Sequence, residues 1–508
     1  MASLGPEDEA ARGVAPFMVG GAGPPTAVGT PPTSVARQRR LRAREARLGM
    51  AVALGFALVL AAARLIDVSE DGKAMLGFSL LFLPALVAAA VARPLWFLLL
   101  AVAFLPFGKV YPLSLGAGIN MSNLILGLAP VAWSVGRARR RGRLRLGWLE
   151  GLVAVYVVVA SLSVVPAMGV AESVGELAQT YRTWLAPMLF FFIARGLVRD
   201  REGLEATLRV MAWVTILVAG LTWLEGIERG DRGSIEASRV PGLMRQANQM
   251  GAFLVYYGIL LVTIGLRERR LPSRLLYFGG FLVAARAILF TFSRSAYLAL
   301  ASGSVLVVLL TSPLLLVAGA GAGAVAVTVK PSLIPESIRA RMGQTTEGVG
   351  LEGENRTLDK SSAYRLILWR AAFRMIREHP MTGVGIGRFS YVVGSYTEVT
   401  LSKEDPNDAH NAFILIAAEN GVPALVLVVV LLVTLVVVAA RVYLRSRYRV
   451  DRTLALAFMG TWVGLIISCM LGSRFGDESL IAYFWILCAL LAVARRLPPR
   501  PSRERRPA

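Results

Sequence analysis

The residue best suited to acid–base chemistry is His410, which lies in the stretch N-D-A-H-N-A-F-I-L-I-A-A-E-N-G at residues 407–421. The chain has only 2 histidines, and this one stands where a polar loop passes directly into an apolar run. A histidine with an ordinary pKa of about 6.5 takes up and returns protons around neutral pH. We therefore predict that His410 is a general base. The alternative is an ordinary polar residue beside Asp408, Asn407 and Asn411, each of which suits a helix N-terminus.

A group of arginines forms the second set of candidates, because a guanidinium stays charged and donates paired hydrogen bonds to phosphate oxygens. Arg239 and Arg245 occur in S-R-V-P-G-L-M-R-Q-A-N-Q-M-G, and Arg294 occurs in T-F-S-R-S-A-Y between two apolar runs. Arg182 begins another apolar run and could join them. The alternative for Arg294 is a turn residue that reaches toward lipid phosphate. Together with His410, these arginines predict a site for a phosphorylated, lipid-linked substrate outside the cytoplasm.

Other candidates lie in the long loop before His410. His379 stands before Pro380 at an expected helix C-terminus, where a histidine interacts favourably with exposed carbonyl groups, so a structural role is favoured. Trp369 and Arg388 are expected to support the loop. The sequence contains no Walker A motif, no zinc-protease motif and no acidic cluster suited to a metal. We therefore expect neither a metal nor a cofactor, and these absences argue against an ATP-driven pump and a metal-dependent glycosyltransferase.

The composition is that of an integral membrane protein. The 508 residues have a mean hydropathy of +0.59, and apolar runs of about 20 residues, long enough to cross a bilayer, recur along the chain. The net charge is +22, but the arginines lie in short clusters between apolar runs, as the positive-inside rule predicts, so we expect no nucleic acid partner. Cys469 and Cys488 both fall inside apolar runs and indicate neither a disulfide nor a metal site. The predicted fold class is all-α, a polytopic transmembrane helical bundle.

The number of spans is expected to be about 12–14. The candidate spans are residues 48–66, 74–92, 94–108, 119–136, 147–166, 180–198, 206–225, 248–266, 274–291, 294–311, 313–329, 412–440, 453–471 and 478–494. Arginines at 37–47 place the N-terminus in the cytoplasm, and each span reverses the side. The C-terminus is then also cytoplasmic, and the long loop at 330–411 lies outside.

This pattern divides the chain into five segments: a disordered cytoplasmic tail at 1–47, spans at 48–329, a large outer loop at 330–411, the last spans at 412–494, and a basic cytoplasmic tail at 495–508. A loop this long is expected to have structure of its own. Residues 361–378 predict an amphipathic helix whose apolar residues recur at helical spacing, namely Leu366, Trp369, Phe373 and Ile376.

Stretches from much of this chain resemble the O-antigen ligase and polysaccharide polymerase superfamily of bacterial envelope enzymes, over about residues 180–440. They are R-V-P-G-L-M-R-Q-A-N-Q-M-G at 239–251, F-S-R-S-A-Y-L at 292–298, L-W-R-A-A-F-R-M-I-R-E-H-P-M-T-G-V-G-I-G-R-F at 368–389, and A-H-N-A-F-I-L-I-A-A-E-N-G at 409–421. Where the family often has N-P-N, this chain has Gln246, Ala247 and Asn248.

The resemblance implies metal-independent transfer of an oligosaccharide from undecaprenyl diphosphate to a hydroxyl of a glycan acceptor, with inversion, on the periplasmic face of the bacterial inner membrane. By their positions in the motifs, Arg239 and Arg294 would hold the diphosphate and His410 would activate the acceptor. The favoured reaction polymerises repeat units of a surface polysaccharide, either O-antigen or exopolysaccharide. The closest alternative is a ligase that attaches finished chains to lipid A core or another acceptor, and a further alternative is a flippase for lipid-linked sugars. Other polysaccharide assembly proteins are possible partners.

Overall fold

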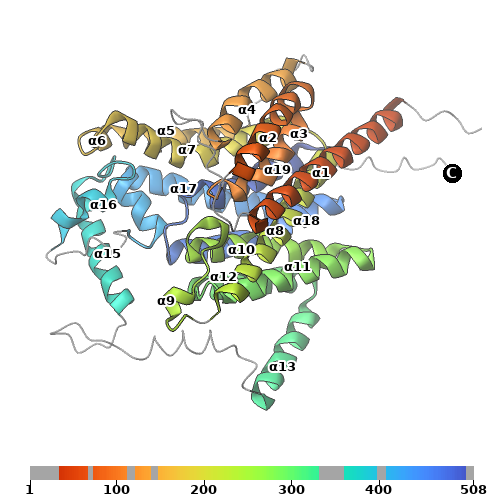
Figure 1. The fold of residues 1–508 in the computed structure, drawn as a ribbon. Coiled ribbons are helices and arrows are strands. Elements are labelled where there is room, and N and C mark those ends of the chain that lie inside the picture. The colour runs from red at the N-terminus through yellow and green to blue at the C-terminus, as the bar shows by residue number, and fades with distance from the viewer. Residues whose placement is uncertain are drawn as a thin grey trace, which may run out of the picture.

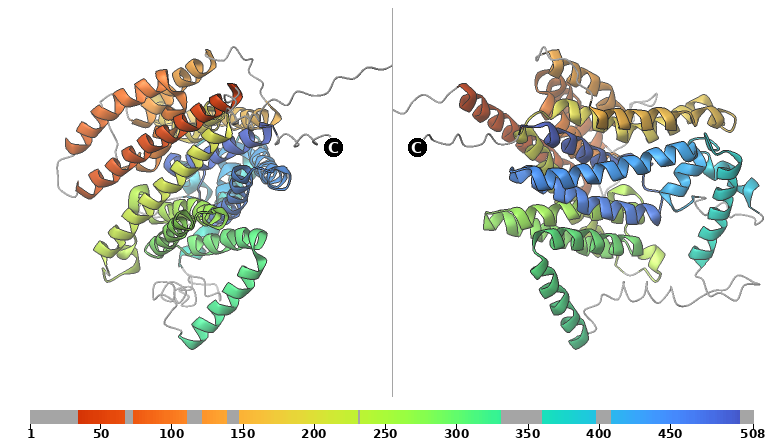
Figure 2. Two further views of the ribbon diagram at one scale, coloured as in Figure 1. Left: turned by 90° about the vertical axis from the view of Figure 1, so that its right-hand side faces the viewer. Right: turned by 180° about the vertical axis from the view of Figure 1, so that it is seen from behind.

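The computed structural model describes residues 34–66, 73–110, 121–138, 147–230, 232–330, 360–397 and 408–498. Within these ranges the regular secondary structure is entirely helical, which confirms the all-α prediction. Most of the long helices run side by side as a bundle, while α13 turns away from it and α15 stands across one end (Figures 1 and 2).

The helices follow the apolar runs of the sequence. The first part contains α1 (Ser34–Ile66), α2 (Lys73–Ala92), α3 (Pro94–Phe104), α4 (Met121–Ala138), α5 (Trp148–Ser161), α6 (Val164–Met168), α7 (Val174–Leu197) and α8 (Arg201–Arg229). The middle part contains α9 (Ile235–Ser238), α10 (Ala247–Arg267), α11 (Leu271–Leu289), α12 (Arg294–Thr311) and α13 (Pro313–Val329). The last part contains α15 (Lys360–Glu378), α16 (Phe389–Val392), α17 (Ala412–Arg445), α18 (Arg449–Met470) and α19 (Glu478–Arg496). Each candidate span overlaps one of these helices, and the span at 147–166 is divided between α5 and α6.

Several of these helices can cross a bilayer. In the described part of the chain, 8 helices are long and apolar enough by length and composition: α1, α5 with α6, α8, α10, α12, α17, α18 and α19. Shorter apolar helices occur at Phe82–Ala92, Pro94–Phe107 and Pro313–Ala322. The chain is therefore a multi-pass membrane protein.

The centre of the bundle is formed by α10 and α19, which are the most deeply buried of the spanning helices. α10 packs against α11 and α18, and α19 packs against α7. The rings of Tyr257 and Tyr483 lie 4.9 Å apart between these two central helices. The Tyr257 hydroxyl donates to the carbonyl of Leu480 at 2.7 Å, and the Tyr483 hydroxyl donates to that of Val102. These bonds satisfy buried hydroxyls without water and join helices that are far apart in sequence.

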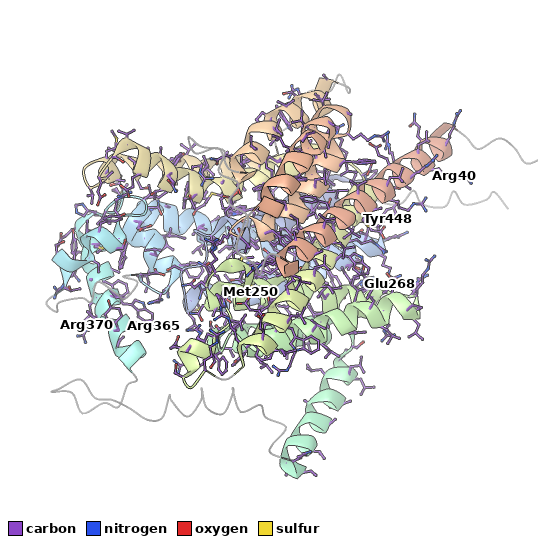
Figure 3. The ribbon with its side chains drawn as sticks, in the orientation of Figure 1. Arg40, Met250, Glu268, Arg365, Arg370 and Tyr448 are labelled. Atoms are coloured by element: carbon purple, nitrogen blue, oxygen red, sulfur yellow. The ribbon has the colours of Figure 1, made fainter. Side chains whose placement is uncertain are left out.

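The bundle has two different ends. Arg42 lies 3.9 Å from Asp200, and Arg201 donates to the carbonyl of Pro498, so the start of α1 and the end of α19 meet at one end, which we name the terminal end. The opposite end, which we name the loop end, carries α9, α15, α16 and the start of α17 (Figure 1). Figure 3 labels residues at both: Arg365 and Arg370 at the loop end, and Arg40, Tyr448 and Glu268 at the terminal end.

The first helix starts earlier than the sequence predicts. Residues 34–47, expected to belong to a disordered tail, form the beginning of α1. Arginine, alanine and leucine favour helix, and a helix extends readily from an apolar segment that is already helical. The Trp96 indole also fixes this segment by donating to the carbonyl of Glu45 at 3.1 Å. Residues 1–33 and 499–508 lie outside the described residues.

Helix α15 occupies the range predicted for the amphipathic helix, but it buries a different face. Leu368, Ala371 and Met375 are at most 1% exposed, whereas Leu366 and Phe373 are 40% and 56% exposed. The predicted face is therefore wrong for these two residues. The reason is that α17 and the 3-10 helix at Val393–Tyr396 pack against the alanine side, where small side chains allow close approach. Residues 331–359 and 398–407 of the predicted loop lie outside the described residues.

Candidate active site

His410 lies at the loop end, just before α17. Its φ of 48° is in the left-handed region, which is uncommon for a residue other than glycine. The side-chain oxygen of Asn411 accepts hydrogen bonds from the backbone N–H groups of Phe413 and Ile414, so Asn411 is the N-cap of α17, as the sequence allowed. Asn407, another expected cap, lies outside the described residues. The cap fixes where the helix begins and thus the place of His410.

Two further elements hold the His410 segment. The indole N–H of Trp369, on α15, donates to the carbonyl of Ala409 at 2.7 Å. On the other side, Oδ1 of Asp408 accepts from the Ser473 hydroxyl at 2.6 Å and from the backbone N–H of His410 at 3.3 Å. Ser473 belongs to the connection between α18 and α19. His410 is therefore positioned jointly by α15, α17 and this connection.

The environment of His410 favours the neutral imidazole. Burial lowers its pKa below the ordinary value of 6.5, the negative charge of Asp408 opposes this, and the positive charges of Arg365 and Arg474 lower the pKa further. A depressed pKa means that the ring is mostly unprotonated at neutral pH. The unprotonated ring is the form that can accept a proton.

Arg239 and Arg294 occupy neighbouring segments of the loop end. Nε of Arg239 donates to the carbonyl of Thr291 at 3.0 Å, in the turn that leads to α12. The backbone N–H of Val240 donates to Phe290 in the same turn, also at 3.0 Å. Arg294 is the first residue of α12. The structure thus brings together two stretches that the sequence singled out separately.

The side chain of Arg239 is also held by polar groups of its own segment. Its guanidinium donates to Glu236 at 3.0 Å and to the amide oxygen of Asn248 at 2.6 Å. Asn248 is the last residue of the stretch Gln246, Ala247 and Asn248 that departs from the family pattern. Arg245, by contrast, is exposed and has a φ of 56°.

Backbone strain coincides with these stretches. In the part of the chain that the structure describes, the non-glycine residues with positive φ are Arg245, Phe292 and His410. Two of them are predicted site residues, and Phe292 lies in the turn before Arg294. Such conformations persist only where the surroundings enforce them, and they cluster at functional sites.

Arg182 lies on α7 and is connected to the loop end through contacts different from those of Arg239 and Arg294. Its guanidinium donates to Asn123 at 2.8 Å and lies 3.7 Å from Glu478 at the start of α19. The preceding residue, Asp477, pairs with Lys109, which also donates to Gln249 at 2.8 Å. The connection at 471–477 therefore touches the Arg182 side and the α10 side, as well as the His410 segment.

The other predicted loop residues have structural contacts. Arg388 is fully buried and forms an ion pair with Glu176 through contacts of 2.7 and 3.1 Å, so it ties the loop to α7. His379 is exposed, and its backbone carbonyl accepts the N–H of Gly383 at 3.0 Å in the turn after α15. The carboxylate of Glu419 accepts from the backbone of Phe389 at 3.1 Å.

The glycine turn after α15 fits closely onto its neighbours. Gly383, Gly385 and Gly387 have φ values of 67°, 111° and 68°, which glycine alone adopts easily. A Cβ atom on Gly385 would fall 2.6 Å from the backbone of Ala167. The N–H groups of Val384 and Gly385 donate to carbonyls in the first turns of α17. This turn therefore packs directly against α6 and α17.

An apolar groove lies between α11 and α12, beside the turn that precedes Arg294. It has a volume of about 460 Å³ and is lined by Phe281, Ala285, Arg286, Ile288, Leu289, Tyr297, Leu300, Ala301 and Ser304. The hydroxyl of Tyr297 donates to the carbonyl of Leu289 at 3.1 Å and so joins the two helices beside the turn.

Sequence reasoning missed the contributions of Arg365, Ser473 and Arg474. Arg365 lies within the helix predicted at 361–378, and Ser473 and Arg474 lie between the last two candidate spans, but none of the three was predicted as a site residue. A stronger signal was available, because S-R-F-G-D-E concentrates charge between two apolar spans on the side assigned to His410. The pairing of that segment with Asp408 is a tertiary contact, which no local pattern reveals.

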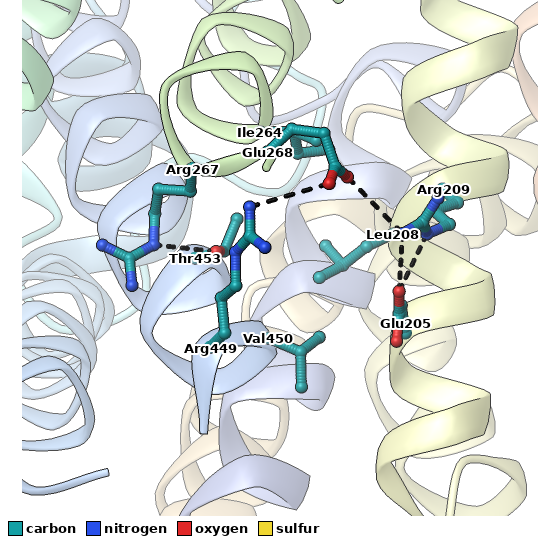
Figure 4. Close-up of a pocket in the computed structure, with 9 residues that line it drawn as sticks. All are labelled: Glu205, Leu208, Arg209, Ile264, Arg267, Glu268, Arg449, Val450 and Thr453. Atoms are coloured by element: carbon teal, nitrogen blue, oxygen red, sulfur yellow. Dashed lines mark hydrogen bonds and ion pairs between the residues drawn. The ribbon is translucent and has the colours of Figure 1, made fainter. Parts of the chain in front are cut away.

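A charged pocket lies at the terminal end and differs from this region (Figure 4). It has a volume of about 150 Å³ between α8, α10 and α18. Glu268 lies 3.7 Å from both Arg209 and Arg449, and Arg209 also contacts Glu205 at 2.7 Å. Arg267 donates to the hydroxyl of Thr453 at 3.0 Å. Most charges here are thus compensated by neighbouring side chains, as expected for contacts that join helix ends.

The fold and these contacts define a class: a polytopic helical membrane protein with a structured loop region at one end. Residues 279–429 match the family model described as O-antigen ligase, in line with the O-antigen ligase and polymerase superfamily that the sequence resembles. The matched segment contains Arg294 and His410 but neither Arg239 nor Arg474. No curated protein matches the chain.

Proposed function

We propose that the chain transfers a glycan from undecaprenyl diphosphate to a sugar hydroxyl at the loop end, which faces the periplasm. The observation that carries this proposal is the setting of His410, a half-buried imidazole with a depressed pKa, in a segment held by Trp369 and Asp408 beside positive charges. The family match supports glycan ligation or polymerisation in general.

The proposed reaction is a direct displacement. The acceptor oxygen attacks the anomeric carbon, the bond from that carbon to the diphosphate breaks, and its electron pair leaves with the diphosphate. His410 receives the proton of the attacking hydroxyl. Arg239 and Arg294, with Arg245 and Arg182, are proposed to stabilise the charge that develops on the departing diphosphate, and the anomeric configuration is inverted.

Two features of the Arg294 region suit a lipid-linked donor. Arg239 and Arg294 lie on adjoining segments, where a diphosphate could contact both. The apolar groove between α11 and α12 begins beside this turn and offers a place for part of a polyprenyl chain. A donor bound in this way would keep its lipid in the membrane and its glycan at the loop end.

The test is product formation by purified protein with a lipid-linked oligosaccharide. His410→Ala should lower the transfer rate by about 10²- to 10⁴-fold, the range typical of a general base. His379→Ala is the matched control, because it removes the other histidine at an exposed position, and it should retain transfer. Undiminished transfer by His410→Ala would refute the assignment, and movement of the lipid across the bilayer without transfer would favour a flippase.

Polymerisation of repeat units is the favoured reaction, with ligation of finished chains as the closest alternative. The glycans that accumulate in cells lacking the gene distinguish polymerisation from ligation. Loss of a polymerase leaves single repeat units, whereas loss of a ligase leaves long chains on the carrier lipid.

A further inference from the structure

Arg474, in the connection between α18 and α19, is a nearly buried cation at the loop end. Its side chain is nearly inaccessible, at 6% exposure. Among the described residues, its Nε is a buried donor without a hydrogen-bond partner, and no carboxylate lies within ion-pair distance of its guanidinium. Buried guanidinium groups are costly unless a negative group compensates them.

The connection gives this side chain a defined place. The preceding residue, Ser473, is bonded to Asp408, and Asp477 pairs with Lys109, so both sides of the segment are anchored. The guanidinium lies against Gly472, where a Cβ atom would come within 2.6 to 3.0 Å of its atoms. Glycine at 472 thus leaves the space that the guanidinium occupies.

Arg474 does not stand alone. Its charge and that of Arg365, from α15, both act on His410, and Asp408 is the negative group that faces the same imidazole. Cations from two separate elements therefore act on the proposed base. Of these two, Arg474 is the nearly buried one, and among the described residues no carboxylate lies within ion-pair distance of it.

We propose that Arg474, with Arg365, forms an anion subsite beside His410, in addition to the groups at Arg239 and Arg294. Its ligand is an oxyanion of a substrate, either the diphosphate of the lipid-linked donor or an acidic group of the acceptor glycan. A guanidinium suits both, because its planar fork donates two hydrogen bonds to phosphate or carboxylate oxygens. The identity of the substrates rests on the proposed function, but the existence of the subsite does not.

The first test measures anion binding without turnover. With only 2 histidines in the chain, the imidazole signals of isotope-labelled protein can be followed by NMR and assigned with His379→Gln. Inorganic pyrophosphate or glucuronate should shift the His410 signal and raise its apparent pKa, because a bound negative charge favours the imidazolium. Arg474→Gln should weaken this binding by about tenfold, as expected when a charged hydrogen-bond donor is lost.

Matched variants distinguish a specific loss of anion binding at the subsite from a general loss of structure. Arg449→Gln removes a cation at the terminal end and should leave binding unchanged. Gly472→Ala keeps the charge but displaces the guanidinium, and should weaken binding if the variant unfolds at the wild-type temperature. Arg474→Lys should recover part of the affinity. Wild-type binding by Arg474→Gln, or no response of His410 to either anion, would overturn the proposal.

Kinetics then identify the source of the anion. A higher KM for the lipid-linked donor in Arg474→Gln indicates the donor diphosphate. A higher KM for an acidic acceptor but not for a neutral one indicates the acceptor. If both KM values and anion binding match the wild type, the subsite does not exist. If NMR detects the subsite but no transfer occurs in the wild type, the proposed function fails while the subsite stands.

Discussion

The two ends of the bundle use arginine differently. At the terminal end, Glu150 is 3% exposed and contacts both Arg195 and Arg496 within 2.8 Å. Asp451 is 1% exposed, and its Oδ2 atom accepts hydrogen bonds from both Nε and Nη2 of Arg201. At the loop end, Arg474 is 6% exposed and has no carboxylate within ion-pair distance among the described residues.

This difference shows that residue type alone does not separate structural arginines from ligand-binding ones. The loop end also has a compensated pair, Arg388 with Glu176, and that pair fastens the loop to α7. For arginines with almost no exposure, the distinguishing property is whether a buried carboxylate of the chain neutralises the charge. Breaking a pair with a buried carboxylate should lower stability, whereas changing a buried arginine that lacks such a partner should weaken substrate binding.

Among the arginine variants, the largest expected effect on activity comes from Arg294→Ala. Loss of a cation that stabilises the departing diphosphate should lower the transfer rate by about 10²- to 10³-fold. The unfolding temperature should stay close to that of the wild type. The rate is measured with purified protein and a lipid-linked oligosaccharide, and a large loss of stability with normal turnover would place Arg294 among the structural arginines.

The largest expected effect on stability comes from Arg201→Gln. This change leaves the carboxylate of Asp451 buried without its partner, so the free energy of unfolding should fall by about 3 kcal/mol. Transfer per folded molecule should persist, because Arg201 lies at the terminal end. Thermal unfolding and the rate per folded molecule are measured together; unchanged stability would contradict the role assigned to this pair.

A smaller effect is expected for Trp369→Phe. The variant keeps the ring and loses the hydrogen bond from the indole to Ala409, a bond worth about 1 kcal/mol, which corresponds to about a fivefold decrease in transfer. The decrease should appear in kcat if the bond positions His410. A change confined to the unfolding temperature would mean that Trp369 supports only the loop.

The pH profile sharpens the comparison through His410 itself. Because the pKa of His410 is depressed, kcat/KM should decrease at low pH with an apparent pKa below the ordinary histidine value of 6.5. Asp408→Asn removes a negative charge that favours the imidazolium, so it should move this decrease to lower pH. Arg474→Gln removes a positive charge that disfavours the imidazolium, so it should move the decrease to higher pH. Shifts in the same direction would contradict the charge arrangement.

Much of the fold could be predicted from the sequence because local patterns determine it. Apolar runs and arginine clusters indicate the helices and the alternation of their ends. The left-handed backbone of His410 could not be predicted, since it results from the cap at Asn411 and the contacts of Trp369 and Asp408. The buried face of α15 was also mispredicted. Its partner α17 packs closely against the face that carries alanines, and the spacing of apolar residues does not distinguish this face from the one with larger residues. The isolation of Arg474 depends on its three-dimensional neighbours and is likewise absent from any local pattern.

The central claim is that the imidazole of His410 accepts the proton of the attacking hydroxyl. Chemical rescue tests it most directly: the transfer rate of purified His410→Ala is measured with and without added imidazole, with Arg294→Ala as the variant that imidazole should not restore. We predict that imidazole increases the rate of His410→Ala, more strongly as the pH rises through the pKa of free imidazole. A His410→Ala protein that transfers glycan at the wild-type rate without imidazole would contradict the claim.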